Sequence, residues 1–131
     1  MNKLQAICLT TLALLVSSAP LIAHHGTASN YDQKKRVKVE GVVKEFWWRN
    51  PHAALFIEGE SDTGTKGTFV LEMGAPAALI NSYGYSRSTF KPGDHVVIHM
   101  WPSYATPTNG QLDQSRIWVN DKELLSKNGK G

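Results

Sequence analysis

The sequence predicts an all-β domain with one short helix, in which five strands close into a small barrel behind a signal peptide. Five segments carry period-2 or short apolar patterns bounded by turn residues, and one helical segment separates the third from the fourth. Three strands, a helix and two strands is the element order of an OB-like β-barrel. An open β-sandwich is the alternative. The barrel is favoured because a single helix at that position would plug one of its ends.

The strands are predicted from alternation and from the turns that bound them. In the first strand, valines alternate with charged residues, and Gly41 is expected to mark a bend or bulge. The second strand follows a predicted turn at Asn50 and Pro51, because Asn favours turn starts and Pro fixes φ. The predicted strands span residues 36–48, 52–60, 67–73, 95–101 and 111–119.

The helix and the last loop are predicted from their terminal residues. A short helix is expected over residues 74–84, with Pro76 in its first turn and Gly84 as its stop. Residues 102–110 are expected to form a loop, in which Asn109 and Gly110 are turn signals.

The N-terminal segment has the features of a secretory signal. A cationic start, Met1 to Lys3, precedes an uncharged apolar run over residues 4–16, and Ala23 offers a cleavage site. The apolar run is shorter than the ~20 residues of a membrane-spanning helix, which disfavours the rival interpretation of an uncleaved anchor. We therefore expect a periplasmic protein with no stable membrane insertion after cleavage. The predicted organisation is a signal peptide at 1–23, a His-containing segment at 24–35, an OB-like barrel at 36–125 and a flexible tail at 126–131.

The composition of the mature chain limits its chemistry and partners. Cleavage leaves 131 − 23 = 108 residues, enough for one small core, and removes Cys8, the only cysteine. The mature chain therefore has neither a thiol nor a disulfide. Without Lys3 it carries 14 − 1 = 13 basic against 11 acidic side chains. This net charge of +2 is too small to neutralise several phosphates, so nucleic acid is not expected as a partner.

The mature N-terminus is a candidate metal site. Cleavage after Ala23 gives His24 a free amine, which can chelate one ion together with its ring Nδ1. Amine and imidazole nitrogens suit Cu(II), Ni(II) or Zn(II), and copper is the favoured ion. His25 or His52 would supply a further nitrogen. The alternative is a polar, extended tail over residues 24–33 with no ligand role.

A second group of residues is expected to support that site. His52 follows the Asn50–Pro51 turn, which would hold its ring in place, although the ring could instead bond only the turn backbone. Glu72 lies between apolar residues near the end of the third strand, as a barrel-rim residue or as an outer partner of an imidazole. Trp48 and Asn50 are candidate contacts. Because neighbouring strand residues face opposite ways, one of Trp47 and Trp48 is expected in the core and the other outside.

His95 and His99 are not expected to share a metal ion. Their strand spacing places them on one face but ~13 Å apart. They are interpreted as rim or face histidines.

The mature chain resembles a family of small exported bacterial proteins of unknown function. Such proteins show His-His-Ser after the signal, a Trp-x-Asn-Pro-His turn, a strand ending in an acidic residue, a Pro-x-x-Leu helix and a Pro-Gly-Asp turn. Gly26 and Phe69 depart from the family's usual Ser and Trp. The resemblance implies a fold and no established activity. The matching residues are His24-His25, Trp48 to His52, Glu72, Pro76 to Leu79, Gly84 and Lys91 to Asp94.

Two functions follow from these patterns. The first is a periplasmic metal-binding protein that holds copper or hands it to a metal-delivery or other periplasmic partner. The second is a metal-independent OB-type module that binds a protein, peptide or small ligand through strands two and three and the Trp47/Trp48 surface. The sequence has no nucleophile with a partnered base, no phosphate-binding loop and no HExxH helix, so it favours a binding protein over an enzyme and predicts no catalytic residues.

Overall fold

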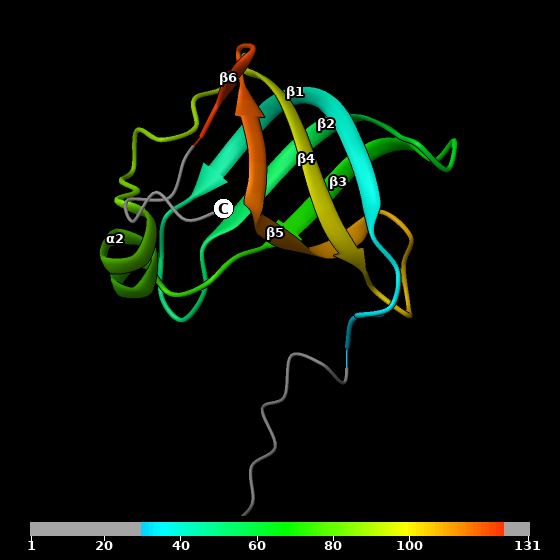
Figure 1. The fold of residues 1–131 in the computed structure, drawn as a ribbon, viewed down its shortest axis with the longest axis horizontal. Helices are drawn as coiled ribbons and strands as arrows, with labels where there is room; N and C mark the ends of the chain where they lie inside the picture. Colours follow the sequence, from blue (N-terminus) through cyan, green and yellow to red (C-terminus); the bar gives the residue numbers. More distant parts are fainter. Residues whose placement is uncertain (1–29, 125–131) are drawn as a thin grey trace, which may run out of the picture.

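The computed structural model describes residues 30–124, which form a closed barrel with one helix at its end (Figure 1). Every predicted strand is present, and a two-residue strand follows the fifth. The elements are β1 (Val37–Trp47), β2 (Ala54–Ser61), β3 (Lys66–Glu72), α2 (Pro76–Tyr83), β4 (His95–Pro102), β5 (Asn109–Val119) and β6 (Lys122–Glu123).

The strand pairing is that of an OB-like barrel, which confirms the predicted fold. β1, β2 and β3 form an antiparallel meander, and β1 also pairs antiparallel with β4. β4 pairs antiparallel with β5, and a short parallel pairing of β3 with β5 closes the sheet (Figure 1). Closure leaves none of these five strands as a free edge along its whole length, which suits a small β domain.

The first strand contains a bulge, but not at Gly41. Pairing with β2 is regular through Gly41, and the register shifts between Val43 and Glu45. A Cβ on Gly41 would lie 2.3 Å from the carbonyl oxygen of Glu58, so glycine is needed there for close approach of the strands rather than for a bend. The bulge inserts one residue and reverses which side chains face inward. It therefore puts Phe46 and Trp48 against the core and Trp47 on the outer surface.

Asn109 and Gly110 begin β5 instead of forming a turn, which corrects the predicted loop. They pair with Val70 and Leu71 of β3 in the parallel ladder that closes the barrel. A Cβ on Gly110 would lie 2.6 Å from Met100 Sδ. Glycine at this position therefore allows close packing over β4, a requirement that is long-range and invisible in the local pattern.

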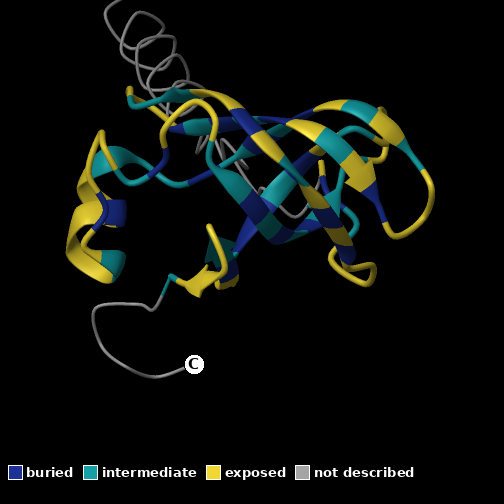
Figure 2. Cartoon of the chain, turned by 90° about the horizontal axis from the view of Figure 1, so that it is seen from above, coloured by how far each residue is buried: buried dark blue, intermediate teal, exposed yellow. Residues whose placement is uncertain are grey.

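The core lies inside the barrel and under α2. Buried and exposed residues alternate along the strands, while most of α2 faces outward (Figure 2). Pro76 stands in the first turn of α2, and Gly84 ends the helix in the left-handed conformation at φ 72°, as predicted. Leu79 is the buried residue of the helix and joins the same core as Phe90 and Leu55. In residues 30–124 there is no helix of the length and apolar character required to cross a membrane.

Candidate functional site

The site lies on the outer face of β2 and β3, beside the turn that joins β1 to β2. The register pairs Trp47 of β1 with Ala54 of β2, and Ala54 with Glu72 of β3. These three side chains therefore form one row across the sheet. His52 stands two residues before Ala54, and backbone hydrogen bonds between Ala53 and residues 73 and 74 extend the ladder to it. The period of two then places the His52 ring on the same face as Glu72.

Glu72 joins two side chains that are far apart in the sequence. Its Oε1 pairs with Nδ1 of His52, and its Oε2 accepts a hydrogen bond from the hydroxyl of Tyr31. The His52 side chain is 46% exposed, and that of Glu72 is 31% exposed. The imidazole is thus held through one nitrogen at a surface that solvent and ligands can reach. A carboxylate on Nδ1 favours the tautomer in which Nε2 carries the free lone pair.

Tyr31 is held in place by the end of β4. Tyr31 forms an isolated antiparallel bridge with Ser103, and the backbone N–H of Asp32 donates to the carbonyl of Pro102 at 2.8 Å. The Tyr31 side chain is buried, although the segment that contains it was expected to be a polar, extended tail. Burial and the hydrogen bond to Glu72 raise the pKa of Tyr31 well above its usual range. The hydroxyl therefore stays protonated at neutral pH and acts as the donor to the carboxylate.

A pocket of about 240 Å³ adjoins this trio. The guanidinium of Arg49 lies over the Trp47 ring, 3.6 Å from its centroid. The ring of Phe56 also contacts Trp47, with centroids 4.5 Å apart. The pocket therefore has aromatic and aliphatic walls with charged groups at its edge. Its lining residues are Tyr31, Trp47, Arg49, His52, Ala53, Ala54, Phe56, Val70, Glu72 and Asn109.

The structure brings together some of the predicted site residues and separates others. His52 and Glu72 are in contact, while His24 and His25 lie outside the described residues. Trp48 packs against the core with its ring 5.7 Å from that of Phe46, so Trp47 is the tryptophan that lines the pocket. Asn50 is exposed in the turn, where it precedes Pro51 through a cis peptide bond.

His95 and His99 lie on β4, away from the pocket. His95 Nε2 is 3.2 Å from Oε1 of Glu40 on β1. The ring of His99 packs edge-on against Trp118, with centroids 6.4 Å apart, and its Nδ1 is buried with no hydrogen-bond partner among residues 30–124. Neither residue lines the pocket beside His52. Within the described chain, no three His, Asp or Glu side chains gather closely enough to hold a metal ion.

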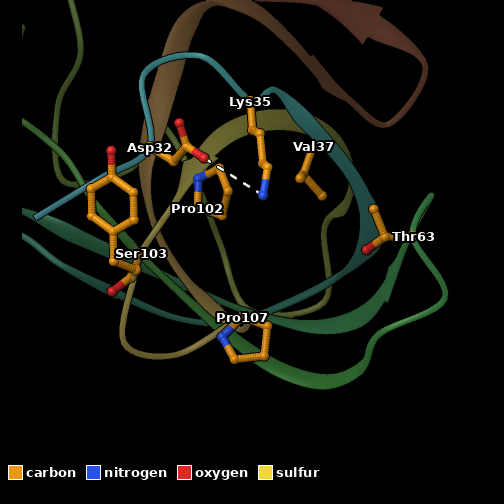
Figure 3. A pocket seen from close by; sticks show the side chains of 8 residues that line it. Asp32, Lys35, Val37, Thr63, Pro102, Ser103 and Pro107 are labelled. Carbon is orange, nitrogen blue, oxygen red and sulfur yellow. Dashed lines mark ion pairs between the residues drawn. The ribbon is translucent and has the colours of Figure 1, made fainter.

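A second pocket, of about 340 Å³, lies beside the segment that leads into β1 (Figure 3). Its charged residues, Asp32 and Lys35, face each other across 3.6 Å, and Pro102 and Pro107 form part of its wall. None of the predicted site residues lines it. The pocket beside His52 is therefore the better candidate, because a held imidazole, a carboxylate and an aromatic wall converge there.

Sequence reasoning did not single out Tyr31 or Arg49. Tyr31 carries a local signal that could have found it, because it is the one large aromatic residue in the polar stretch 24–35. Arg49 directly follows two tryptophans, but its stacking on Trp47 depends on the turn conformation. The placement of Tyr31 beside His52 required the barrel to be closed.

Comparison with known proteins gives a family for this fold and site. The model of a family of unknown function, DUF6152, matches residues 12–112. The chain belongs to the DUF6152 family. This confirms the resemblance to a family of unknown function, and the match includes β1 to β4, the Asn50–Pro51 turn and Glu72. No curated protein and no solved structure matches this DUF6152 protein.

Proposed function

We propose that this DUF6152 protein is exported to the periplasm and there binds a transition metal, copper above others, through His24, His25 and His52. The observation that supports this most is the His52–Glu72 pair. Metal-binding histidines commonly donate their other ring N–H to a carboxylate, which sets the tautomer and raises the basicity of the ligand nitrogen. His52 has this arrangement on an exposed ring.

The remaining ligands come from the mature N-terminus. A metal at His52 needs further nitrogens, and His24 offers an amine and a ring Nδ1 once the signal is removed. Tyr31 lies only seven residues after His24, and its hydroxyl donates a hydrogen bond to Glu72, the carboxylate that also holds His52. Seven residues can span up to about 25 Å, so the terminus is able to reach His52 without moving Tyr31.

This site is suited to holding an ion or passing it to a partner protein. Its ligands are neutral nitrogens, which bind copper well, and the site lies at the surface. Neither a catalytic base nor a nucleophile is part of the proposal.

The test uses mature protein that begins at His24, titrated with Cu(II) against a competing chelator. The matched control carries three extra glycines ahead of His24, which keep every side chain, separate the terminal amine from the His24 ring and leave no histidine in position three, where it would form a strong Cu(II) chelate of its own. We expect tight one-to-one binding that the extra glycines weaken strongly. Equal affinities of the two proteins would exclude the N-terminal chelate. Intact mass and metal content of protein isolated from the periplasm test export, cleavage after Ala23 and metal loading together.

A second candidate function is a metal-independent binding module. The pocket beside Trp47 favours it, because it lies on the face of strands two and three and near the β4–β5 loop, where OB folds commonly bind ligands. This argument compares the position of the pocket with that of ligand sites in other OB folds, and it is an analogy between folds. Ligand binding that is unaffected by a chelator would support this candidate.

A further inference from the structure

The Arg49 guanidinium is held as a flat cation at the edge of the pocket. It stacks on the face of Trp47 at 3.6 Å from the ring centroid, while Phe56 contacts the same indole. Stacking uses the face of the guanidinium and leaves its in-plane N–H donors available. Those donors match the two oxygens of a carboxylate, and little side-chain freedom remains to be lost when they bind one.

The charge of Arg49 is not neutralised by the described part of the chain. None of the five ion pairs found among residues 30–124 includes Arg49. The other charged group of the pocket, Glu72, is already engaged by His52 and Tyr31. Arg49 is therefore the charged lining residue of this pocket that none of these ion pairs includes.

The walls next to Arg49 are apolar. Ala54 and Phe56 of β2 and Val70 of β3 lie on the same outer face and line the pocket. About 240 Å³ is below the roughly 300–1,000 Å³ of clefts that hold drug-sized ligands. The pocket thus has room for one small apolar group.

We propose that this pocket binds a small organic acid in its ionised form, with the carboxylate on Arg49 and an apolar body against Phe56 and Val70. This inference rests on the second candidate function and names its ligand class. It does not depend on copper, and the test is made on protein stripped of metal, so that failure of the metal proposal leaves its result unchanged.

The experiment compares two probes that differ only in charge. Isotope-labelled mature protein is stripped of metal with EDTA, and the EDTA is removed by gel filtration. The protein is then titrated with N-acetyl-leucine and, separately, with its neutral amide, N-acetyl-leucinamide, while amide and indole N–H signals are followed by NMR. We expect the signals of Trp47 and Val70 to shift, and the acid to bind about tenfold or more tightly than the amide, because hydrogen bonds to a charged group are stronger. No shift with either probe would overturn the proposal, and so would equal affinity for both. In the latter case the pocket would still be a ligand site, but not one selected by Arg49.

Three variants test whether Arg49 causes the preference for the acid over the amide. Arg49→Gln should remove the preference for the acid, and its exposed position means that the fold is retained. Arg49→Lys should keep only part of the preference, because it keeps the charge but lacks the planar fork. Arg87→Gln is the matched control, since it removes one exposed arginine that does not line the pocket. A preference that survives Arg49→Gln, or that falls as much in Arg87→Gln, would overturn the proposal.

Discussion

The turn before β2 and the middle of β4 each present a histidine at the barrel surface, and the two rings have opposite environments. His52 is close to half-exposed, and its Nδ1 is held by Glu72. His99 is partly buried against Trp118, with its Nδ1 enclosed and unpartnered within the described chain. Burial, followed by repulsion from Arg36, lowers the pKa of His99.

The difference shows that a histidine's chemistry is decided by what surrounds each ring nitrogen. A carboxylate on one nitrogen and solvent on the other prepare a ring to bind a metal. Burial and nearby arginines keep a ring neutral but enclose a nitrogen that an ion would need. Both residues are histidines on the same small barrel, so the contrast can be tested by equivalent substitutions.

The largest expected effect is on copper affinity. Loss of a residue that only supports a metal ligand typically weakens metal binding by about 10–100-fold. His52→Ala should weaken Cu(II) binding by more than this, because it removes a direct ligand. His99→Ala should leave the affinity unchanged. Competition titrations of the two variants beside the unmodified mature protein measure this. Equal losses in both variants would remove the contrast between the two histidines.

The next effect concerns the carboxylate that holds His52. Glu72→Gln should weaken Cu(II) binding by about 10–100-fold, since the amide orients the ring less firmly and does not raise its basicity. Glu58→Gln is the matched control. Glu58 is a residue of β2 on the exposed face of the sheet, where it accepts a hydrogen bond from Thr68 of β3 at 2.7 Å. An unchanged affinity in Glu72→Gln would show that Glu72 has no part in metal binding.

A smaller effect is expected from the pH dependence of stability at His99. The pKa of His99 is lower in the folded chain than its ordinary value of 6.5, so the unfolded chain takes up a proton first as the pH falls. The contribution of His99 is therefore fully present above pH 6.5 and is lost as the pH falls from 6.5 through the folded-state pKa. His99→Gln should show a smaller loss of unfolding free energy than the unmodified protein over that interval, measured by urea denaturation at several pH values. Parallel curves for the two proteins would contradict the burial argument.

The smallest expected effect is at the tyrosine that supports Glu72. Tyr31→Phe keeps the buried ring but removes the hydroxyl that donates to Glu72, and it should lower the unfolding free energy by about 1 kcal/mol. Copper affinity should fall only a few-fold, well below the loss in Glu72→Gln. Tyr104→Phe serves as the control, because that side chain is 67% exposed. A loss of affinity as large as in Glu72→Gln would make Tyr31 a main support of the site.

The fold was largely predictable because its signals are local. Alternation, the Asn50–Pro51 turn and the Pro76 and Gly84 helix limits each depend on a few neighbouring residues. The misplaced features were those that depend on distant strands. Gly41 and Gly110 are glycines because backbone or side chains of other strands approach them closely, and this requirement leaves no mark in the adjacent sequence.

The candidate site was predictable only in its residue types. His52 and Glu72 were named from a turn and from a lone acidic residue in an apolar strand, but their contact depends on the register of β2 with β3. The choice between Trp47 and Trp48 depended on the bulge between Val43 and Glu45, which shifts the alternation by one residue. Such a shift is set by pairing with β2, not by the residues of β1 alone.

The sequence alone thus determined the order of strands and helix, the barrel class and the family resemblance, because each rests on patterns along the chain. It also predicts the exported, copper-binding terminus at His24 and His25, which lies outside residues 30–124 and stays a prediction. Only the tertiary structure decided that Tyr31, His52 and Glu72 meet beside Trp47 and Arg49. The physical reason is barrel closure: it brings the segment before β1 next to the ends of β3 and β4, over separations that no local pattern encodes.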